Sequence, residues 1–361
     1  EMEVFYNPVM KINRDITVLI LKAMGKKEMH IGLPLEGSGI RGIRFLKELD
    51  KKTIKTIAFN DYSDKAVKSI KKNLQLNGIR NVTIEKICNY KENKKIKEKK
   101  VQLYCEEANL FLLHSHGFDY IDIDPFGTSN PFLDSALKRI GREGILAITN
   151  TDTASLAGTY PSVCKRLYWA TPKHGNLMHE LGLRILIRKV QLIGMQYEKA
   201  LIPIFSYFKD HYFRVFFRCV KGKKECDKLV KQYGFFAQAG PLWLGPLFDE
   251  ALTKKMHHEA QQQYTKNSTK EIKKEKKIGK NIENVDSTRD LLSFLSIIKD
   301  ESGIPAVGFF ETHETKAAHI VRKDVLIKQL KKKGFLAAPT HFSGTAIRTN
   351  APIKIIMQLA K

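Results

Sequence analysis

The sequence predicts an α/β protein: a doubly wound, mainly parallel sheet, followed by a smaller α+β domain. Three observations predict it. Short apolar runs alternate with helical patterns, two later runs are joined tightly enough to require a hairpin, and the pattern changes to a charged linker near residue 222. At 361 residues the chain is long enough for one large domain or two ordinary ones. We therefore expect domains at 1–222 and 223–361.

The chain opens with an amphipathic helix. Asn7 is a favourable N-cap, and Pro8 suits the first helical position. The apolar residues that follow share one helical face: Val9, Ile12, Ile16, Leu19, Ile20 and Ala23. This spacing predicts a helix with one buried side.

Strand-like runs and helices then alternate. The runs cover 56–60, 101–105, 118–123 and 144–149. Ser63 can cap a helix that passes Leu74 and stops at Asn77-Gly78, and Pro131 opens another that ends near Gly141. Such alternation is typical of a parallel sheet with helices on its faces.

A hairpin follows the long helical pattern at 176–197. The runs at 200–208 and 212–220 are joined by only three residues, Lys209-Asp210-His211. So short a connection permits only antiparallel pairing. We expect a reversed strand at the edge of the otherwise parallel sheet.

The C-terminal part contains a proline-glycine stretch at 240–246 and several helices. Its end has a basic helical pattern at 324–333, then Gly334, two short extended runs and an amphipathic segment from Ile353. This order is typical of a winged-helix-like module. Such a module can contact nucleic acid, or it can pack only against its neighbour.

The charge indicates a phosphate-rich partner. There are 62 Lys and Arg against 38 Asp and Glu, a formal net charge of +24. Nucleic acid is the favoured partner. A lysine-rich surface kept for solubility, or the ion pairs of a heat-adapted protein, would give a similar composition.

The cysteines and the absence of apolar spans indicate the compartment. The 5 cysteines are an odd number without paired spacing, so we interpret them as reduced thiols. The sequence shows no secretion signal and no run of about 18 apolar residues. We expect a soluble, cytoplasmic protein with no membrane partner and no obligate protein partner.

A glycine-rich segment, E-G-S-G-I-R-G at 36–42, predicts a nucleotide site. Gly37 and Gly39 let the backbone approach a ligand, and Asp61, about 20 residues on, would bind a ribose hydroxyl. The motif alone is weak, because dinucleotide-dependent oxidoreductases and S-adenosylmethionine-dependent methyltransferases both use such a loop.

Other residues favour the methyl donor S-adenosylmethionine. They are the acidic E-E-A at 106–108, the D-P-F-G that ends a strand, and the reversed hairpin. Glu107 could accept from the adenine amine, with the Ala108 amide nearby for a ring nitrogen. Arg14 and Arg41 are candidates for the donor's carboxylate, although each could instead form a surface ion pair.

D-P-F-G predicts a site for an amine on a nucleobase. Asp124 can accept an N–H of the amine and then its proton, and Pro125 leaves carbonyls facing the pocket. Phe126 offers a flat face to an extruded base. Alternatively, the stretch is a turn in which Asp124 caps the helix of Pro131, but that leaves the aromatic residue unexplained.

Long, ordered blocks carry a family resemblance across the chain. They are V-F-Y-N-P-V-M-K-I-N-R-D-I at 4–16, G-I-R-G-I-R-F at 39–45, D-I-D-P-F-G at 122–127, T-D at 151–152, H-E-L-G-L-R-I-L at 179–186, D-H-Y-F-R-V-F at 210–216, G-P-L-W-L-G-P-L at 240–247 and T-H-F-S-G-T-A-I-R-T-N-A-P at 340–352. The sequence resembles the tRNA guanine-26 N2-dimethyltransferases.

The resemblance implies a class I, Rossmann-like methyltransferase domain followed by a family-specific tRNA-binding domain. It implies transfer of methyl groups from S-adenosylmethionine to guanine N2 of tRNA, giving mono- and dimethylguanosine. By position it implies donor binding by Arg14, Arg41, Asp61, Glu107 and Ala108, catalysis by Asp124, and base stacking by Phe126 and Phe5.

Some residues depart from the family pattern. Leu33 stands where an acid is usual at the end of the first strand, with Glu36 as a possible substitute. Only Cys219 and Cys226 lie before the G-P-L-W-L-G block, where many relatives have cysteine pairs suited to zinc, so we expect no metal. Alternatives are a tRNA-binding protein without turnover, or a methyltransferase acting on another RNA amino group.

Overall fold

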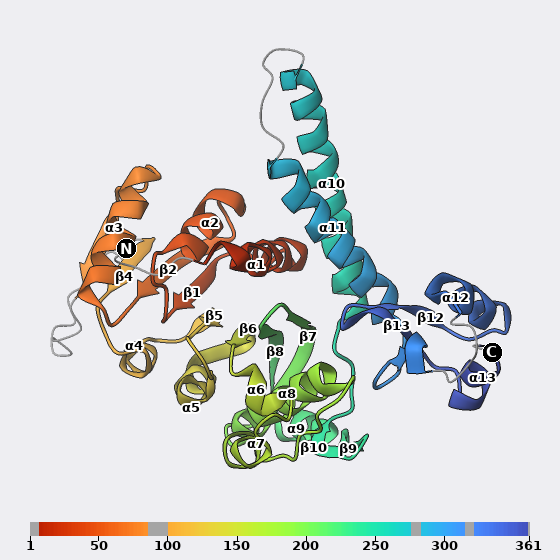
Figure 1. Cartoon of the computed structure of the whole chain (residues 1–361). Coiled ribbons are helices and arrows are strands. Elements are labelled where there is room, and N and C mark those ends of the chain that lie inside the picture. Colours follow the sequence, from red (N-terminus) through yellow and green to blue (C-terminus); the bar gives the residue numbers. More distant parts are fainter. Residues whose placement is uncertain (1–6, 86–99, 276–282, 315–320, 360–361) are drawn as a thin grey trace. The chain divides into compact units, whose positions relative to one another are not determined.

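The computed structural model describes residues 7–85, 100–275, 283–314 and 321–359 (Figure 1). Contacts between Cα atoms divide the chain into two compact units. Unit 1 comprises 1–153, 187–204 and 211–232; unit 2 comprises 154–186, 205–210 and 233–361. The units therefore interleave along the sequence. The domain boundary at residue 222 stays a prediction, and Phe5 lies outside the described residues.

An eight-stranded sheet organises unit 1, in the order β3-β4-β2-β1-β5-β6-β8-β7. The strands are β1 (Met29–Leu33), β2 (Ile54–Asn60), β3 (Val82–Glu85), β4 (Val101–Tyr104), β5 (Phe118–Ile123), β6 (Ile140–Asn150), β7 (Lys199–Lys209) and β8 (Tyr212–Lys221). Strands β3 to β6, with β1 and β2, pair in parallel, whereas β8 is antiparallel to β6. The predicted α/β class is confirmed.

The predicted hairpin forms, with one difference in its position. The reversed strand β8 lies inside the sheet between β6 and β7, and β7 is the outermost strand. The apolar residues of β8 explain this, because Phe213, Phe216 and Phe217, which lie on both faces of the strand, are fully buried. A reversed edge strand with one solvated face would not bury them all.

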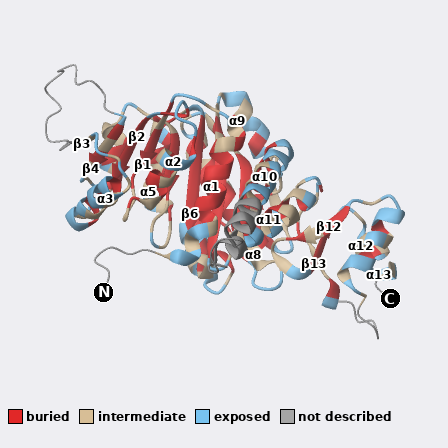
Figure 2. Cartoon of the chain, turned by 90° about the horizontal axis from the view of Figure 1, so that it is seen from above, coloured by how far each residue is buried: buried red, intermediate tan, exposed pale blue. Residues whose placement is uncertain are grey.

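Helices cover both faces of the sheet in unit 1. They are α1 (Lys11–Met24), α2 (Ile40–Glu48), α3 (Asp64–Leu76), α4 (Ala108–His114), α5 (Asn130–Arg139) and α9 (Lys223–Val230), while α8 (Met178–Met195) runs through both units. Figure 1 shows α1, α2 and α3 on one face and α4 and α5 on the other. The strands between them are almost entirely buried (Figure 2).

Local signals in the sequence explain where these helices begin and end. The Asn7 side chain accepts from the Val9 amide at 3.0 Å and so caps the short 3-10 helix Pro8–Met10 that leads into α1. Helix α1 ends at Gly25, which is left-handed with φ 63°. Ser63 caps α3 in the same way, through the Ala66 amide.

Unit 2 contains helices and two small antiparallel sheets. Its helices are α6 (Thr153–Leu156, which begins at the last residue of unit 1), α7 (Pro161–Tyr168), α10 (Glu250–Glu275), α11 (Glu283–Ser302), the 3-10 helix Thr312–Glu314, α12 (Lys323–Lys332) and α13 (Ile353–Leu359). Strands β9 (Tyr233–Phe236) and β10 (Ala239–Trp243) form a hairpin, and β11 (Phe310–Glu311), β13 (Ser343–Thr349) and β12 (Ala337–Thr340) form a sheet in that order.

The end of unit 2 has the predicted winged-helix-like order of helix, two strands and helix. Leu326 and Leu330 of α12, Ile347 of β13 and Ile356 of α13 are buried together. The basic residues of α12 lie on its other sides, where Lys331 and Lys332 are exposed. These apolar residues form a small core of their own at the end of unit 2.

Candidate active site

The glycine loop connects β1 to α2, beyond the carboxyl end of the sheet. Gly37 and Gly39 have φ values of 55° and 79°, which residues with a side chain rarely adopt. A Cβ atom at Gly42 would lie 2.3 Å from the Phe59 ring and 2.7 Å from Leu33. Gly42 is thus required for close packing of α2 on the sheet, whereas Gly37 and Gly39 shape the loop.

Asp61, the predicted ribose acid, follows β2 and holds this loop. Its Oδ2 accepts from the Gly37 amide at 2.9 Å, and its Oδ1 accepts from the Ser63 amide at 3.0 Å. The next side chain, Tyr62, is 78% exposed. The structure therefore brings the acid and the glycine loop together, as the motif predicts.

Asn60 joins the ends of three strands, which the sequence analysis missed. Its amide nitrogen donates to the carbonyl oxygens of Pro34 and Glu106, each at 3.0 Å, and its Oδ1 accepts from the Glu106 amide at 3.1 Å. These bonds fix the acidic segment beside the glycine loop. A polar residue at the end of an apolar run was the signal.

Glu107 is the N-cap of α4. Its Oε2 accepts from the amides of Asn109 and Leu110 at 2.8 and 3.0 Å. Ala108 is the first residue of the helix, where backbone N–H groups lack an acceptor within the helix. The predicted adenine-binding pair therefore lies at a helix start, beyond the end of β4.

An ion pair between Arg41 and Asp124 lies at the carboxyl end of β5. Arg41 Nη2 donates to Asp124 Oδ2, and Arg41 Nη1 donates to Asn13 Oδ1 at 2.9 Å and Thr17 Oγ1 at 3.2 Å. The Arg41 side chain is 6% exposed, but that of Asp124 is 23% exposed. Among the described residues, none donates to Asp124 Oδ1, so this oxygen is available to a substrate.

A fully buried ion pair between Arg214 and Asp122 lies next to Arg41. Arg214 donates to both oxygens of Asp122, at 2.8 and 2.7 Å, and to Thr149 Oγ1 at 2.8 Å. Tyr120 also donates to Asp122 at 2.5 Å, and Arg41 Nη1 lies 3.4 Å from the same carboxylate. Burial opposes ionisation of Asp122, but Arg214 and Arg41 hold the pKa of its carboxyl below its usual range.

Sequence reasoning missed Asp122 and Arg214 as site residues. Both stand inside otherwise apolar strand runs, D-I-D-P-F-G and Y-F-R-V-F. A charged residue in a buried strand needs a partner of opposite charge. That rule could have paired them, but only the antiparallel pairing of β6 with β8 brings Arg214 next to Thr149.

The D-P-F-G loop is fixed by the T-D block. Gly127 has φ 79°, and its amide donates to Thr151 Oγ1 at 2.7 Å, while the Thr151 amide donates to the Gly127 carbonyl at 2.9 Å. The Phe126 side chain is 81% exposed. Helix α5 has Ser129 as its N-cap, so Asp124 does not cap the helix of Pro131.

Glu36 and Arg14 are also among the residues that the sequence analysis proposed for the donor site. Glu36 Oε1 accepts from the Gly42 amide at 2.9 Å, and burial raises the pKa of its carboxyl to about 8. Arg14 lies in α1 and is 7% exposed, with Nη1 and Nη2 each donating to the Asn7 carbonyl at 3.2 Å. Its neighbour in α1, Asn13, accepts a hydrogen bond from Arg41.

Neither a metal site nor a membrane-spanning helix is present among the described residues. No three side chains of His, Cys, Asp or Glu come together there as metal ligands would. None of the helices in those segments has the length and apolar character to span a bilayer. The expected absence of a metal stays a prediction.

Known proteins are similar to this chain over nearly its whole length. A family model described as N2,N2-dimethylguanosine tRNA methyltransferase matches residues 1–239 and 235–361. The tRNA (guanine(26)-N(2)/guanine(27)-N(2))-dimethyltransferase of Aquifex aeolicus is 36% identical, over 99% of this chain and 90% of its own. The tRNA (guanine(26)-N(2))-dimethyltransferase of Thermococcus kodakarensis is 34% identical, over 99% and 93%.

A solved structure has a similar fold. Trm1 from Pyrococcus horikoshii, in complex with S-adenosyl-L-methionine, is 32% identical and superposes with a TM-score of 0.79 over 99% of this chain and 95% of that chain. These matches confirm the resemblance that the sequence blocks indicated. The chain belongs to the family of N2,N2-dimethylguanosine tRNA methyltransferases.

Proposed function

We propose that this protein transfers methyl groups from S-adenosylmethionine to the exocyclic N2 of guanine 26 in tRNA, giving mono- and then dimethylguanosine. The observation that carries the proposal is Asp124, whose Oδ2 is bound by Arg41 while no described residue binds its Oδ1. Phe126, two residues further along the chain, is 81% exposed. An acceptor next to an aromatic platform suits an amine on an extruded base. The family relationship supports the same chemistry.

The residues at the ends of β1, β2 and β4 fit this donor. Gly37 has nothing within 4 Å of the position a Cβ would take, so the loop leaves room for a ligand. Asp61 binds the ribose hydroxyls, Glu107 accepts from the adenine amine, and the Ala108 amide serves a ring nitrogen. Arg14 binds the donor's carboxylate. The donor, when bound, supplies an electrophilic methyl group on its sulfonium sulfur.

Asp124 positions the nucleophile and removes its proton. In the first transfer its open Oδ1 accepts one N–H of the guanine amine, and the Pro125 carbonyl accepts the other. In the second transfer Oδ1 accepts the single N–H that remains. These bonds localise the nitrogen lone pair for attack on the methyl carbon. As the N–C bond forms, the bond between the methyl carbon and the donor's sulfur breaks and the donor leaves as a neutral thioether. The proton of the amine then passes to Asp124. Arg41, held by Asn13 and Thr17, keeps the carboxylate in this orientation.

Phe126 provides the stacking surface for the extruded guanine, with Phe5 as a second aromatic residue from the N-terminal block. A stack of this kind contributes about 1–3 kcal/mol per base. The net charge of +24 attracts the tRNA backbone. We further propose that the protein acts in the cytoplasm, without a metal, a membrane or an obligate protein partner.

The test is methylation of an unmodified tRNA transcript by the purified chain with isotopically labelled S-adenosylmethionine. Nucleoside mass spectrometry should find labelled N2-methyl- and N2,N2-dimethylguanosine, and a transcript with adenine at position 26 should remove it. Label at position 27 would extend the substrate range, as in the name of the Aquifex aeolicus relative. Binding of tRNA and donor without labelled nucleoside would contradict the proposal and favour a binding-only protein.

A further inference from the structure

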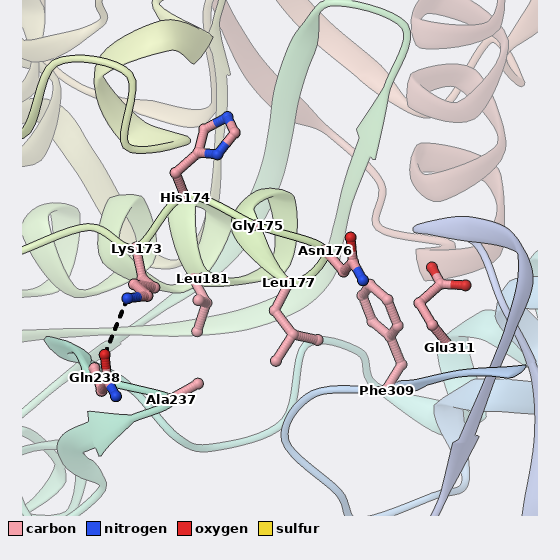
Figure 3. Close-up of a pocket in the computed structure, with 10 residues that line it drawn as sticks. All are labelled: Lys173, His174, Gly175, Asn176, Leu177, Leu181, Ala237, Gln238, Phe309 and Glu311. Atoms are coloured by element: carbon pink, nitrogen blue, oxygen red, sulfur yellow. Dashed lines mark hydrogen bonds between the residues drawn. The ribbon is translucent and has the colours of Figure 1, made fainter. Parts of the chain in front are cut away.

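A cavity lies in unit 2 and is lined by none of the residues assigned above. It has a volume of about 330 Å³ and is formed by the loop before α8, the tip of the β9–β10 hairpin and the segment around β11 (Figure 3). Leu177 and Leu181 contribute its apolar surface. This volume is at the lower end of the range for small-molecule sites and suits a ligand the size of one nucleotide.

The backbone around the cavity is held in a defined shape. Ala237 and Gln238, at the hairpin tip, have φ values of 48° and 65°, a left-handed conformation that non-glycine residues adopt at a cost. The loop before α8 is joined to this hairpin by two backbone hydrogen bonds between Thr171 and Gly240, each 2.8 Å long. The cavity is therefore a built feature rather than a gap between loose loops.

The lining groups differ in chemistry from one end to the other. Lys173 lies at one end, where its Nζ donates to Gln238 Oε1 at 3.0 Å, and Glu311 lies at the other (Figure 3). Glu311 Oε2 accepts from Thr345 Oγ1 at 2.8 Å, which fixes the carboxylate. The cavity thus offers a cation and a carboxylate on opposite sides of an apolar surface.

Phe309 lies between these charges, on the side of Glu311. One face of its ring stacks on Phe342, with centroids 5.8 Å apart and planes 13° from parallel. Phe342 in turn lies under the Arg348 guanidinium, 5.8 Å from the ring centroid. Because this stack holds Phe309 in place, the ring is preorganised to receive another flat group.

The segments around the cavity carry further features of an RNA surface. Between Thr153 and His179 the chain has Lys165, Arg166 and Lys173 but no acidic residue. The exposed aromatic side chains Trp169, 47% exposed, and Phe235, 70% exposed, lie on the same loop and hairpin. Basic groups interleaved with exposed aromatic rings are typical of contacts with unstacked nucleotides.

We propose that this cavity binds one unstacked nucleotide of the tRNA, distinct from the guanine that is methylated. The base stacks on Phe309, its N–H donors meet Glu311, and the phosphate lies toward Lys173. Guanine fits best, because its adjacent N1–H and N2–H groups both point at a carboxylate on the Watson–Crick edge. The site rests on the proposed function, since it assumes that tRNA is the substrate.

The test compares tRNA affinities of the full chain at several salt concentrations, measured by fluorescence anisotropy with a labelled transcript. Phe309→Ala should weaken binding about tenfold and leave the salt slope unchanged. Lys173→Ala should weaken it and lower the slope by about 1. Phe309→Tyr should restore binding. Lys254→Ala, an exposed lysine of α10 that is paired with Glu250 and does not line the cavity, is the matched control and should change affinity less than twofold.

One further variant, Glu311→Gln, and binding of S-adenosylmethionine distinguish failure of the nucleotide site from failure of the methyltransferase proposal. Glu311→Gln, which keeps the shape, should weaken tRNA binding a few-fold, and all variants should bind S-adenosylmethionine like the wild type. Wild-type affinity for tRNA in both Phe309→Ala and Glu311→Gln would overturn the nucleotide site while leaving the methyltransferase proposal intact. A wild-type protein that binds no tRNA would overturn both.

Discussion

Two networks of buried charge, one in each unit, are built from similar groups but end differently. In unit 1, Arg41 and Arg214 surround Asp122, and the chain of contacts ends at Asp124, whose side chain is 23% exposed. In unit 2, Arg184 and Arg348 surround Glu180 and Glu301, and no side chain of these four is more than 3% exposed. One network opens to a ligand, and the other is closed.

The closed network satisfies its carboxylates completely. Glu180 accepts from Arg184, from Arg348 and from the Gly308 amide. Burial alone would raise the pKa of Glu180, but the two arginines lower it to about 2. Glu301 similarly accepts from Thr340, Arg348 and His341. Every oxygen has a donor, which is the arrangement that makes a buried ion pair tolerable.

The difference teaches how to separate a functional from a structural charge cluster. Desolvated arginine–carboxylate pairs and shifted pKa values occur in both units, so neither property identifies the active site. What distinguishes unit 1 is one carboxylate oxygen, Asp124 Oδ1, that no described residue binds, in a loop that also carries the exposed Phe126. We therefore expect substitutions in unit 1 to change rate, and those in unit 2 to change stability.

The largest expected effect is on the rate, from Asp124→Asn. Arg41 requires an acceptor, so the amide oxygen should face Arg41 and the NH2 group should face the guanine amine, donor against donor. We expect kcat to fall by about 10²–10⁴, with tRNA affinity nearly unchanged. Steady-state methylation and tRNA binding check this. Near-normal turnover would remove Asp124 from the mechanism.

Next in size is the effect of Arg348→Met on stability. The substitution leaves Glu180 and Glu301 buried with fewer partners, which should lower the free energy of unfolding by about 3–5 kcal/mol. Chemical denaturation measures this, and the rate per folded molecule should stay close to wild type. Lys254→Met, which removes an exposed ion pair with Glu250, is the control and should cost less than about 1 kcal/mol.

A pH-dependent effect is expected from Glu36. Its pKa rises from 4.5 to about 8 on folding, so its contribution to stability is complete below pH 4.5 and is lost as pH rises through 8. Relative to Glu36→Gln, the wild type should lose about 4 kcal/mol between pH 5 and 9. Parallel stability curves for the two proteins would show that the carboxyl is not buried as described.

The smallest effect distinguishes two roles for Arg41. A lysine cannot reach Asn13, Thr17, Asp122 and Asp124 together, so Arg41→Lys should misplace Asp124 and lower kcat about tenfold. The dissociation constant for S-adenosylmethionine should then stay within twofold, as measured by calorimetry. A weaker donor affinity with unchanged kcat would instead support Arg41 as a ligand of the donor's carboxylate.

Local patterns in the sequence sufficed for most of the fold. Caps at Asn7 and Ser63, the apolar runs and the tight turn at 209–211 predicted their elements within a few residues. The glycine motif and D-P-F-G also pointed to loops that the parallel sheet brings to one edge. In these cases the signal and the structure it produces lie within a few residues of each other.

Contacts across the chain could not be predicted this way. Arg41 binds Asp124, 83 positions away, a contact that the sequence analysis did not predict. Arg214 and Asp122 are 92 positions apart and meet only because β8 is reversed. The interleaving of the two units was equally hidden, because a boundary drawn from composition assumes that each unit is one continuous segment.

The most direct test of the central claim measures rate and stability together for one carboxylate from each network. Asp124→Asn and Glu301→Gln each remove a single charge from a carboxylate beside arginine. In single-turnover methylation of bound tRNA, Asp124→Asn should lose at least about 10² in rate while its free energy of unfolding stays near wild type. Glu301→Gln should retain the rate per folded molecule and lose stability. The reverse pattern, a fast Asp124→Asn and a slow but stable Glu301→Gln, would contradict the account.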